Sequence, residues 1–401
     1  MCFGGNSLLL GMEKFKFKRM GLLPRILIAI LLGALCGIFF PLGLVKAFVT
    51  FNSLFSNMLQ FFIPLIIIGL VTPAIAEVGD KAGKLLLITV SIAYLDTIFA
   101  GFLSYFTSVN VFPGLITGRE TMEGISEAES IAPYFTVNIP AMFDVMSSLV
   151  FAFTVGLGIA FFKAPTIRSF AGEFRDIIAK AIEVVLIPLL PIYIFGIILN
   201  MAYTGQALQI FKVFISIIGV IFVLHVLLLI LQYSVAGIVA GKNPFRLLAK
   251  MLPAYFTALG TSSSAATIPV SLEQTKKNGV DDAVAGFAIP LCATIHLSGS
   301  CLKIVACAVA LMLMKGMPFS FGMFAGFICM LGIMMVAAPG VPGGAIMAAL
   351  GVLSSMLGFG AEEQALMIAL YITMDSFGTA CNVTGDGAIA VVIDKFFGAK
   401  K

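Results

Sequence analysis

The sequence predicts an all-α membrane protein that crosses the bilayer several times. Of its 401 residues, 60% are hydrophobic and only 11% are charged, whereas about a quarter of the residues of a soluble domain are charged. So few charges cannot cover a soluble protein, which excludes a water-soluble enzyme, a nucleic-acid binder and a disordered chain. A spanning helix needs about 20 apolar residues, and the apolar runs are long enough for eight such helices.

The seven Cys residues show no paired spacing and lie mostly inside apolar runs. We therefore expect small packing residues rather than disulfides or a cysteine metal site, and we expect no cofactor.

Basic residues before the first apolar run predict a cytoplasmic segment over residues 1–20. They are Lys14, Lys16, Lys18, Arg19 and Arg25. A cleavable signal peptide is the alternative, but its cleavage needs small residues after the apolar stretch. Ile26 to Phe40 instead runs directly into Pro41 and a second apolar segment, so we expect an uncleaved signal anchor.

Charge alternation predicts six spans in the first 240 residues. We expect them at 21–44, 50–76, 85–112, 139–162, 181–202 and 207–240. The basic segments after the second, fourth and sixth spans belong inside, and the acidic stretch 108–140 belongs outside. Both termini are then cytoplasmic.

The rest of the chain contains two apolar segments that are interrupted near their middle. Residues 250–278 are cut by Gly260 to Ser264, which leaves arms of about ten residues that are too short to cross. Residues 319–360 are cut by Pro339 to Gly344. Both segments predict re-entrant helical hairpins.

Each hairpin is followed by a span with a polar, glycine-containing break. Residues 281–315 contain the break Thr294 to Ser300, and residues 363–397 contain the break Asn382 to Asp386. This repeated order is typical of the inverted repeats of secondary transporters, because exposed backbone at membrane depth is tolerated only where it lines a cavity. Glycine-rich helix packing is the alternative, and it explains one interruption better than four.

Few ionisable residues lie in the apolar runs, and their cost there makes them functional candidates. They are Asp96, His225, His296, Lys303, Asp375 and Asp386. His225 stands alone on an apolar helix, which predicts a packing role. His296 lies in a break, so a structural role and ligand contact are both open.

The last span places four polar residues on one helical stripe, because they are spaced by 4, 3 and 4 residues. They are Asp375, Thr379, Asn382 and Asp386. A carboxylate beside loosened backbone supplies hard oxygen ligands for an alkali cation. Asp386 with Asn382 is therefore a candidate cation site, and a structural carboxylate bonded to Ser or Thr is the alternative.

Four motifs carry a family resemblance, at residues 261–269, 290–295, 340–343 and 382–386. They resemble the two hairpin tips and two broken helices of the dicarboxylate/amino acid:cation symporters, the glutamate-transporter family. The resemblance covers most of the chain and is strongest from residue 250 onward. It implies a sodium-coupled homotrimer in the plasma (inner) membrane of a prokaryote, with an elevator mechanism and the two hairpin tips as gates.

The resemblance divides each protomer into a fixed scaffold and a moving transport part. The scaffold comprises residues 21–76 and 139–202. The transport part comprises residues 85–112 and 207–240, the hairpins 250–278 and 319–360, and the broken helices 281–315 and 363–397.

The resemblance also implies site residues. By this resemblance, Asp375 holds the amino group of the substrate, and the serine-rich first tip touches the carboxylate of the substrate. The implied substrate contacts are Ser263, Ser264, Gly340, Val341, Pro342, Asp375, Gly378, Thr379 and Asn382. The implied sodium ligands are Cys292, Thr294, His296, Asn382 and Asp386, with Asp96 and Thr97 as further candidates.

Three departures from the family pattern bear on the substrate. Gly378 stands where acidic-amino-acid members have Arg, the second tip is one residue short, and His296 to Ser300 replaces Asn-Met-Asp-Gly-Thr. Because Gly378 removes a bidentate cation, we expect a small neutral amino acid of the serine, threonine or alanine kind. Acidic amino acids or C4-dicarboxylates, held by another cation such as Lys303 and coupled to sodium or protons, are the alternative.

Asp96 and Lys303 are predicted to form an ion pair. Lys303 lies seven residues after His296 and hence on nearly the same helical face, and an unpaired ammonium at that depth is costly. The tethered ammonium would then replace one mobile cation and leave two coupled sodium ions. Alternatively, Lys303 faces the headgroups while Asp96 binds sodium, or His296 and Asp96 pass a proton.

The sequence disfavours two other classes of protein, an intramembrane aspartyl protease and a channel. An intramembrane aspartyl protease needs two facing carboxylates, but Asp375 and Asp386 on one helix are separated by about 16 Å of rise. The sequence therefore predicts no enzyme. Nothing resembles a repeated selectivity filter, although an anion leak stays open.

Overall fold

The computed structural model describes residues 21–80, 84–116, 131–205, 207–338 and 342–398. Within these ranges all regular structure is helical, which confirms the predicted all-α class. The predicted cytoplasmic segment 1–20 lies outside the described residues.

The helices up to residue 240 correspond to the first six predicted spans. They are α1 (Leu22–Phe39), α2 (Leu42–Asp80), α3 (Lys84–Ile116), α4 (Val145–Phe162), α5 (Pro165–Ala181), a π-helical segment (Ile182–Leu186), α6 (Ile187–Tyr203) and α7 (Ala207–Ala240). The basic segment before the fifth predicted span is thus itself helical, as α5.

The later helices come in short pairs. They are α8 (Pro244–Thr261), α9 (Ser264–Lys277), α10 (Asp282–Ile295), α11 (Ser298–Met314), α12 (Phe321–Ala337), α13 (Gly344–Leu357), α14 (Ala361–Thr373) and α15 (Asp375–Phe397). The pairs α8/α9 and α12/α13 occupy the two predicted hairpins, and the members of each pair pack against each other. Their re-entry into a bilayer stays a prediction.

The first hairpin shows why these residues fold as two helices. Asn243 caps α8, because its Oδ1 accepts a hydrogen bond of 3.1 Å from Arg246 N, and Pro244 occupies the first helical position. Ser262 ends α8 in the left-handed region, with φ at 52°. Ser263 then caps α9 through a bond of 3.3 Å from Ala266 N to its Oγ.

The two later spans are both interrupted, but only one interruption lies where the sequence predicts it. The first lies at His296 and Leu297, between α10 and α11, within the predicted break. The second lies at Met374, between α14 and α15. The predicted break at Asn382 to Asp386 is wrong, because α15 continues through it.

The glycines of this motif serve close packing instead of a break. A Cβ atom at Gly385 would lie 2.9 Å from Gln232 Oε1 and 3.0 Å from the His296 ring. A Cβ atom at Gly387 would lie 2.8 Å from the Tyr233 hydroxyl. The glycines therefore let α7 and the first break approach α15 closely, as small residues do in membrane bundles.

The described residues contain seven helical segments that are long and apolar enough to cross a membrane, judged by length and composition. The predicted fourth span, α4, has a shorter apolar stretch, from Ser147 to Phe162. Large apolar side chains point outward from these helices, with Phe161 82% exposed and Ile238 81% exposed. Such exposure suits lipid better than water. The structure thus supports a polytopic membrane protein, and an eighth span stays a prediction.

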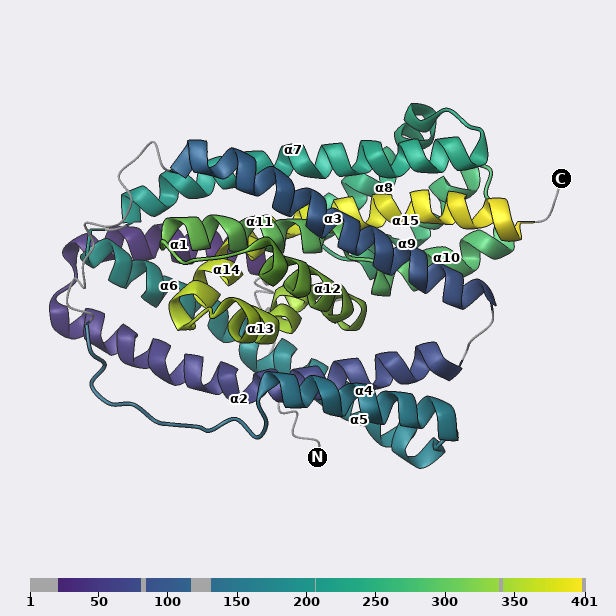
Figure 1. Cartoon of the computed structure of the whole chain (residues 1–401). Helices are drawn as coiled ribbons and strands as arrows, with labels where there is room; N and C mark the ends of the chain where they lie inside the picture. The colour runs from purple at the N-terminus through teal and green to yellow at the C-terminus, as the bar shows by residue number, and fades with distance from the viewer. Residues whose placement is uncertain (1–20, 81–83, 117–130, 206, 339–341, 399–401) are drawn as a thin grey trace, which may run out of the picture.

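Two groups of helices make up the bundle. Helix α1 packs on α6, and α2 packs on α4, α5 and α6. Helix α3 packs on α11, and α15 packs on α7, α8 and α10. Figure 1 shows α3 and α7 along one side of the molecule and α2, α4 and α5 along the opposite side, with the second hairpin between them.

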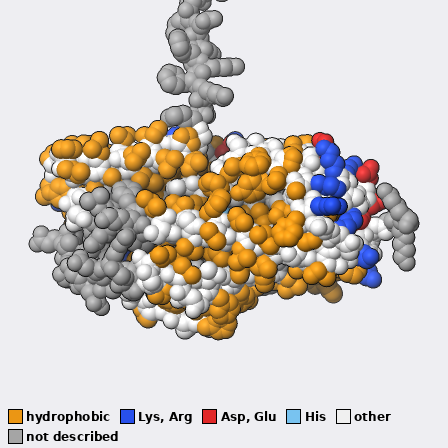
Figure 2. Space-filling view, turned by 90° about the horizontal axis from the view of Figure 1, so that it is seen from above, with side chains coloured by type: hydrophobic (Ala, Val, Ile, Leu, Met, Phe, Trp, Pro, Cys, Tyr) orange, Lys and Arg blue, Asp and Glu red, His pale blue; other side chains and the backbone are white. Residues whose placement is uncertain are grey.

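Charged side chains gather at one end of the bundle. In Figure 2 the visible face is largely apolar, and the Lys, Arg, Asp and Glu side chains cluster at a single end. In Figure 1, α7 ends and α8 begins at that end of the molecule. The connection carries Lys242, and the first half of α8 carries Arg246 and Lys250. A basic end of this kind is expected on the cytoplasmic side.

Candidate substrate and ion site

A small cavity of about 40 Å³ lies where the first hairpin tip meets the two interrupted spans. Its polar lining consists of Ser262, Ser264, Thr294, Ser300, Tyr371, Asp375, Thr379 and Asn382. One water needs about 10–15 Å³ of such space, so the cavity holds about three waters. The site can therefore enclose only a small solute unless the hairpin tips move.

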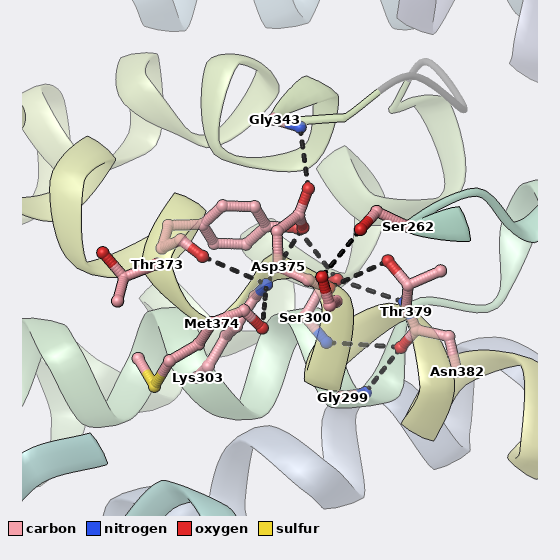
Figure 3. Close-up of polar contacts among 12 residues, drawn as sticks. Ser262, Gly299, Ser300, Lys303, Gly343, Thr373, Met374, Asp375, Thr379 and Asn382 are labelled. Atoms are coloured by element: carbon pink, nitrogen blue, oxygen red, sulfur yellow. Dashed lines mark hydrogen bonds and ion pairs between the residues drawn. The ribbon is translucent and has the colours of Figure 1, made fainter. Parts of the chain in front are cut away.

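Asp375 is the charged side chain in this lining, and both of its oxygens are engaged (Figure 3). Lys303 Nζ donates to Oδ1 at 3.1 Å. Gly343 N, at the start of α13, donates to Oδ2 at 3.1 Å. The carboxylate thus joins α15, α11 and the second hairpin.

Lys303 is completely buried behind Asp375. Its side chain is 0% exposed and that of Asp375 is 11% exposed. Its Nζ also lies 3.4 Å from the carbonyl oxygens of Tyr371 and Met374 and 3.4 Å from the centre of the Tyr371 ring. A buried ammonium needs such partners, because desolvation of an unpaired charge is costly.

Gly378 provides the space for this ammonium. A Cβ atom at position 378 would lie 2.7 Å from Lys303 Nζ and 3.0 Å from its Cε. A side chain at position 378 would therefore collide with Lys303. The two residues fit each other, although they belong to different helices.

Asn382 fixes the start of α11. Its Oδ1 accepts hydrogen bonds from Gly299 N at 2.8 Å and from Ser300 N at 3.3 Å. Its Nδ2 donates to Ser300 Oγ at 3.1 Å, and this hydroxyl also shares a bond of 3.0 Å with Tyr371 Oη. The free N–H groups of an interrupted helix are satisfied in this way.

The first hairpin tip reaches the cavity through two serines. Ser264 lines it, and Ser262 lines it while sharing a bond of 2.7 Å with Ser376 Oγ. Ser263 caps α9 instead and does not line the cavity. Of the expected contacts in the second tip, Gly340 and Val341 lie outside the described residues, and Pro342 is exposed.

A second polar cluster lies beside the first, where His296 bridges two carboxylates. His296 Nε2 lies 2.7 Å from Asp96 Oδ2, and His296 Nδ1 lies 2.8 Å from Asp386 Oδ1. Gln232 Nε2 donates to Asp96 Oδ2 at 2.6 Å and to Ser298 Oγ at 3.1 Å. The cluster therefore ties α3, α7 and α15 to the break between α10 and α11.

Hydrogen-bond geometry restricts the charge of this cluster. An ionised carboxylate can only accept, and a neutral imidazole has one N–H. Since each ring nitrogen faces a carboxylate oxygen, either the ring carries two protons or one carboxyl group is protonated. The three side chains then carry a single net negative charge, which can be balanced by one monovalent cation.

The predicted ion pair between Asp96 and Lys303 is wrong. Lys303 pairs with Asp375, and Asp96 bonds to His296 and Gln232. The prediction assumed one continuous helix from His296 to Lys303, but α11 begins only at Ser298. The interruption changes the helical phase, so the two side chains face different neighbours.

The other expected sodium ligands bond mainly to their own helices. Thr97 Oγ1 donates to Ala93 O at 2.8 Å, and Thr294 Oγ1 donates to Leu291 O at 2.7 Å. The Cys292 carbonyl oxygen accepts from His296 N at 2.8 Å. Gln232 Oε1 is a buried oxygen without a hydrogen-bond partner among the described residues, and it lies in the cluster that contains Asp386.

His225 has a structural contact, in keeping with its predicted packing role. It is buried, and its Nε2 lies 3.0 Å from the Gly299 carbonyl oxygen. The imidazole thus supports the backbone at the start of α11.

Sequence reasoning missed four residues of the two clusters: Gln232, Ser262, Ser300 and Tyr371. Gln232 carried a usable signal, because it is a polar residue in the apolar run of α7. Ser262 and Ser300 lie within the first hairpin tip and the first break, and Tyr371 lies in an apolar run without a local signal.

The chain is similar in sequence to known proteins over most of its length. The sequence model of the sodium:dicarboxylate symporter family matches residues 22–396. Excitatory amino acid transporter 3 of Mus musculus is 30% identical over 256 residues, which cover 63% of this chain and 49% of that protein. The chain thus spans about half the length of this relative. The serine/threonine transporter SstT of Acinetobacter baylyi is 25% identical over 395 residues, covering 94% of this chain and 98% of that protein.

Proposed function

The chain belongs to the sodium:dicarboxylate symporter family, and on that premise we propose that it imports a small solute with one carboxylate together with sodium. This family consists of transporters and not of enzymes, and sodium is its coupling ion. The first candidate substrate is a neutral amino acid of the serine, threonine or alanine kind.

The charge of the cavity lining carries this proposal. Asp375 is the charged residue among the lining residues that the structure describes, and position 378 is a glycine. The nearby cation, Lys303, is already paired with Asp375. A second carboxylate on the substrate would therefore meet hydroxyl and amide groups without a free cation, which disfavours a dianion.

The relatives support the same substrate class. SstT, which matches over nearly its whole length, is named as a serine/threonine transporter. The excitatory amino acid transporters match this chain over about half of their own length. Acidic amino acids or C4-dicarboxylates are therefore the alternative substrates. If Lys303 leaves Asp375, its ammonium can pair with a second carboxylate on the substrate, which favours that alternative.

We further propose that sodium binds near Asp386 and Asn382. The Asp386 cluster carries one net negative charge, because each ring nitrogen of His296 faces a carboxylate oxygen. Gln232 Oε1 adds a buried oxygen that has no described partner. Hard oxygen ligands of this kind suit an alkali cation. Coupling to protons through His296 is the alternative.

We also propose an elevator mechanism, which the packing of the helices supports, within the homotrimer that the family resemblance implies. Helices α1, α2, α4, α5 and α6 pack against one another. All lining residues of the cavity lie on helices or breaks from α8 onward. The helices from α8 onward, with α3 and α7, can therefore carry the site as a unit, while α1, α2, α4, α5 and α6 remain as the scaffold. We place the protein in a prokaryotic plasma membrane with both termini cytoplasmic.

A thermal-shift screen of the purified full-length protein tests the substrate proposal. A ligand at 100 times its Kd stabilises the folded state by about 2.7 kcal/mol. Serine, threonine or alanine should raise Tm in sodium and not in potassium. Stabilisation by succinate or aspartate, with none by these neutral amino acids, would contradict the proposal.

A further inference from the structure

We propose that Lys303 is a built-in ammonium group for Asp375, so that the site takes short monocarboxylates that lack an amino group, such as 2-hydroxy acids. This inference rests on the proposed sodium-coupled function and names a further substrate class for the same cavity. Lys303 acts through Asp375 and is therefore a positioning residue that determines specificity.

The carboxylate that would receive a substrate ammonium is already occupied. Lys303 Nζ lies 3.1 Å from one oxygen of Asp375, and Gly343 N lies 3.1 Å from the other. An amino acid must displace one of these donors before its own ammonium can bind. An acid without an amino group has no such requirement.

Lys303 is held where it lies by more than Asp375. The Tyr371 and Met374 carbonyl oxygens each lie 3.4 Å from Nζ, and the Tyr371 ring lies under it at 3.4 Å. These contacts come from the end of α14 and the break that follows it. The Tyr371 carbonyl oxygen already accepts from Met374 N at 3.2 Å and the Met374 carbonyl oxygen from Gly378 N at 3.1 Å, and each has a second lone pair for Nζ. Displacement of Lys303 would lose all of them and leave two buried charges unpaired.

The space beside Gly378 shows that this position is built into the site. A Cβ atom there would lie 2.7 Å from Nζ, so the ammonium depends on the glycine. Gly378 on α15 therefore leaves the space that Lys303 on α11 fills.

The other polar groups that line the cavity are neutral. Ser262, Ser264, Thr294 and Thr379 bring hydroxyl groups to the cavity, and Lys303 itself does not line it. Thr294 and Thr379 already donate their hydroxyl hydrogens to the carbonyl oxygens of Leu291 and Asp375, so they can accept from a ligand hydroxyl. Ser264, and Ser262 when Ser376 is the donor in their shared bond, can donate to a carboxylate. The paired Asp375 contributes no net charge that would repel a carboxylate. A short 2-hydroxy acid matches this lining.

Matched ligand pairs test the inference in the unmodified protein. L-Serine is compared with glycerate, and L-alanine with lactate, by calorimetric titration of the full-length protein in sodium. We expect each hydroxy acid to bind about tenfold or more tightly than its amino acid. Equal or tighter binding of the amino acids would overturn the inference.

Variants then test the role of Lys303. In Lys303→Met, Asp375 is free for a substrate ammonium, so serine should gain about tenfold and glycerate should lose about tenfold. Because this variant leaves a buried carboxylate unpaired and can fail to fold, the double variant Lys303→Met with Asp375→Asn serves as a second test. It should keep glycerate binding and gain no serine binding, and loss of glycerate binding in a folded double variant would count against the inference.

Lys315→Met is the matched control. Lys315 follows the same helix and pairs with Glu362 at 2.8 Å, away from the cavity. Lys315→Met should change neither the affinity for serine nor that for glycerate. If it changes them as much as Lys303→Met does, the effect comes from the loss of a positive charge in general.

The outcomes separate the inference from the proposed function. Sodium-dependent binding that favours serine and alanine overturns the inference and leaves the proposed function intact. Binding of succinate or aspartate alone, or binding that ignores sodium in both ligand series, overturns the proposed function and with it the inference.

Discussion

His296 Nδ1 lies 2.8 Å from Asp386 Oδ1, and both side chains are buried. The contact joins the break between α10 and α11 to the middle of α15. It makes the proposed cation site part of the same hydrogen-bond network that fixes the break. Asp386 contributes a carboxylate to the proposed cation site, so its replacement should act mainly on ion coupling. His296 bridges two carboxylates, so its replacement should act mainly on folding.

Replacement of Asp386 should weaken sodium coupling. Asp386→Asn keeps the size of the side chain but removes the charged ligand from a poorly hydrated site, so the sodium concentration for half-maximal transport should rise by about tenfold or more. Asp282→Asn, at an exposed carboxylate that pairs with Lys276, is the control. Unchanged sodium dependence in folded Asp386→Asn would refute the assignment.

Replacement of His296 should destabilise the fold. In His296→Ala the carboxylates of Asp96 and Asp386 lose their shared partner, and removal of one member of a buried charged network costs about 3–5 kcal/mol. Thermal unfolding in detergent measures the loss. Adding Asp96→Asn should restore part of the stability, because it removes one unpaired charge. Strictly additive effects would show that the three side chains do not act as one cluster.

A side chain at position 378 should disturb Lys303. In Gly378→Ala the new methyl group would lie 2.7 Å from Nζ, so substrate binding should weaken by about tenfold. Gly219→Ala on α7 is the control, because nothing lies within 4 Å of its added Cβ and alanine favours a helix over glycine by about 1 kcal/mol. Normal binding in Gly378→Ala would mean that Lys303 can move without loss.

Double-mutant cycles should identify the partner of Lys303. Lys303→Met and Asp375→Asn should couple by about 0.5–3 kcal/mol, because the two side chains are in direct contact. Lys303→Met and Asp96→Asn should be nearly additive. The reverse pattern, measured by thermal unfolding, would restore the ion pair between Asp96 and Lys303.

Topology can be tested with an introduced thiol. Lys276, near the end of α9, should face the cytoplasm, because the basic connections around the first hairpin belong inside. Lys276→Cys in a background that lacks Cys2, Cys36 and Cys329 should react with an impermeant reagent only in inside-out vesicles. Labelling in intact cells would contradict the hairpin assignment.

The helix pairs α8/α9 and α12/α13 and the first break could be predicted, because they depend on local signals. Ser262 and Ser263 interrupt an apolar run with residues that favour turns and helix caps. The second break was misplaced, because glycines such as Gly385 read as helix breakers although they serve close packing with Gln232. A sequence alone does not show which neighbour a glycine approaches.

The partner of Lys303 could not be predicted for a related reason. Helical phase predicts which residues share a face only within an unbroken helix, and the break before Ser298 separates His296 from Lys303. The contact with Asp375 depends on how α11 and the start of α15 are packed. It therefore required the three-dimensional arrangement.

Uptake into proteoliposomes at imposed sodium gradients tests the central claim most directly. The full-length protein is reconstituted, and internal and external concentrations of labelled serine and lactate are compared at steady state. A symporter predicts that one of these solutes is concentrated inside, that the ratio rises with the sodium gradient, and that it collapses when an ionophore removes the gradient. A steady-state ratio that stays at one, whatever the sodium gradient, would contradict sodium-coupled import of a one-carboxylate solute.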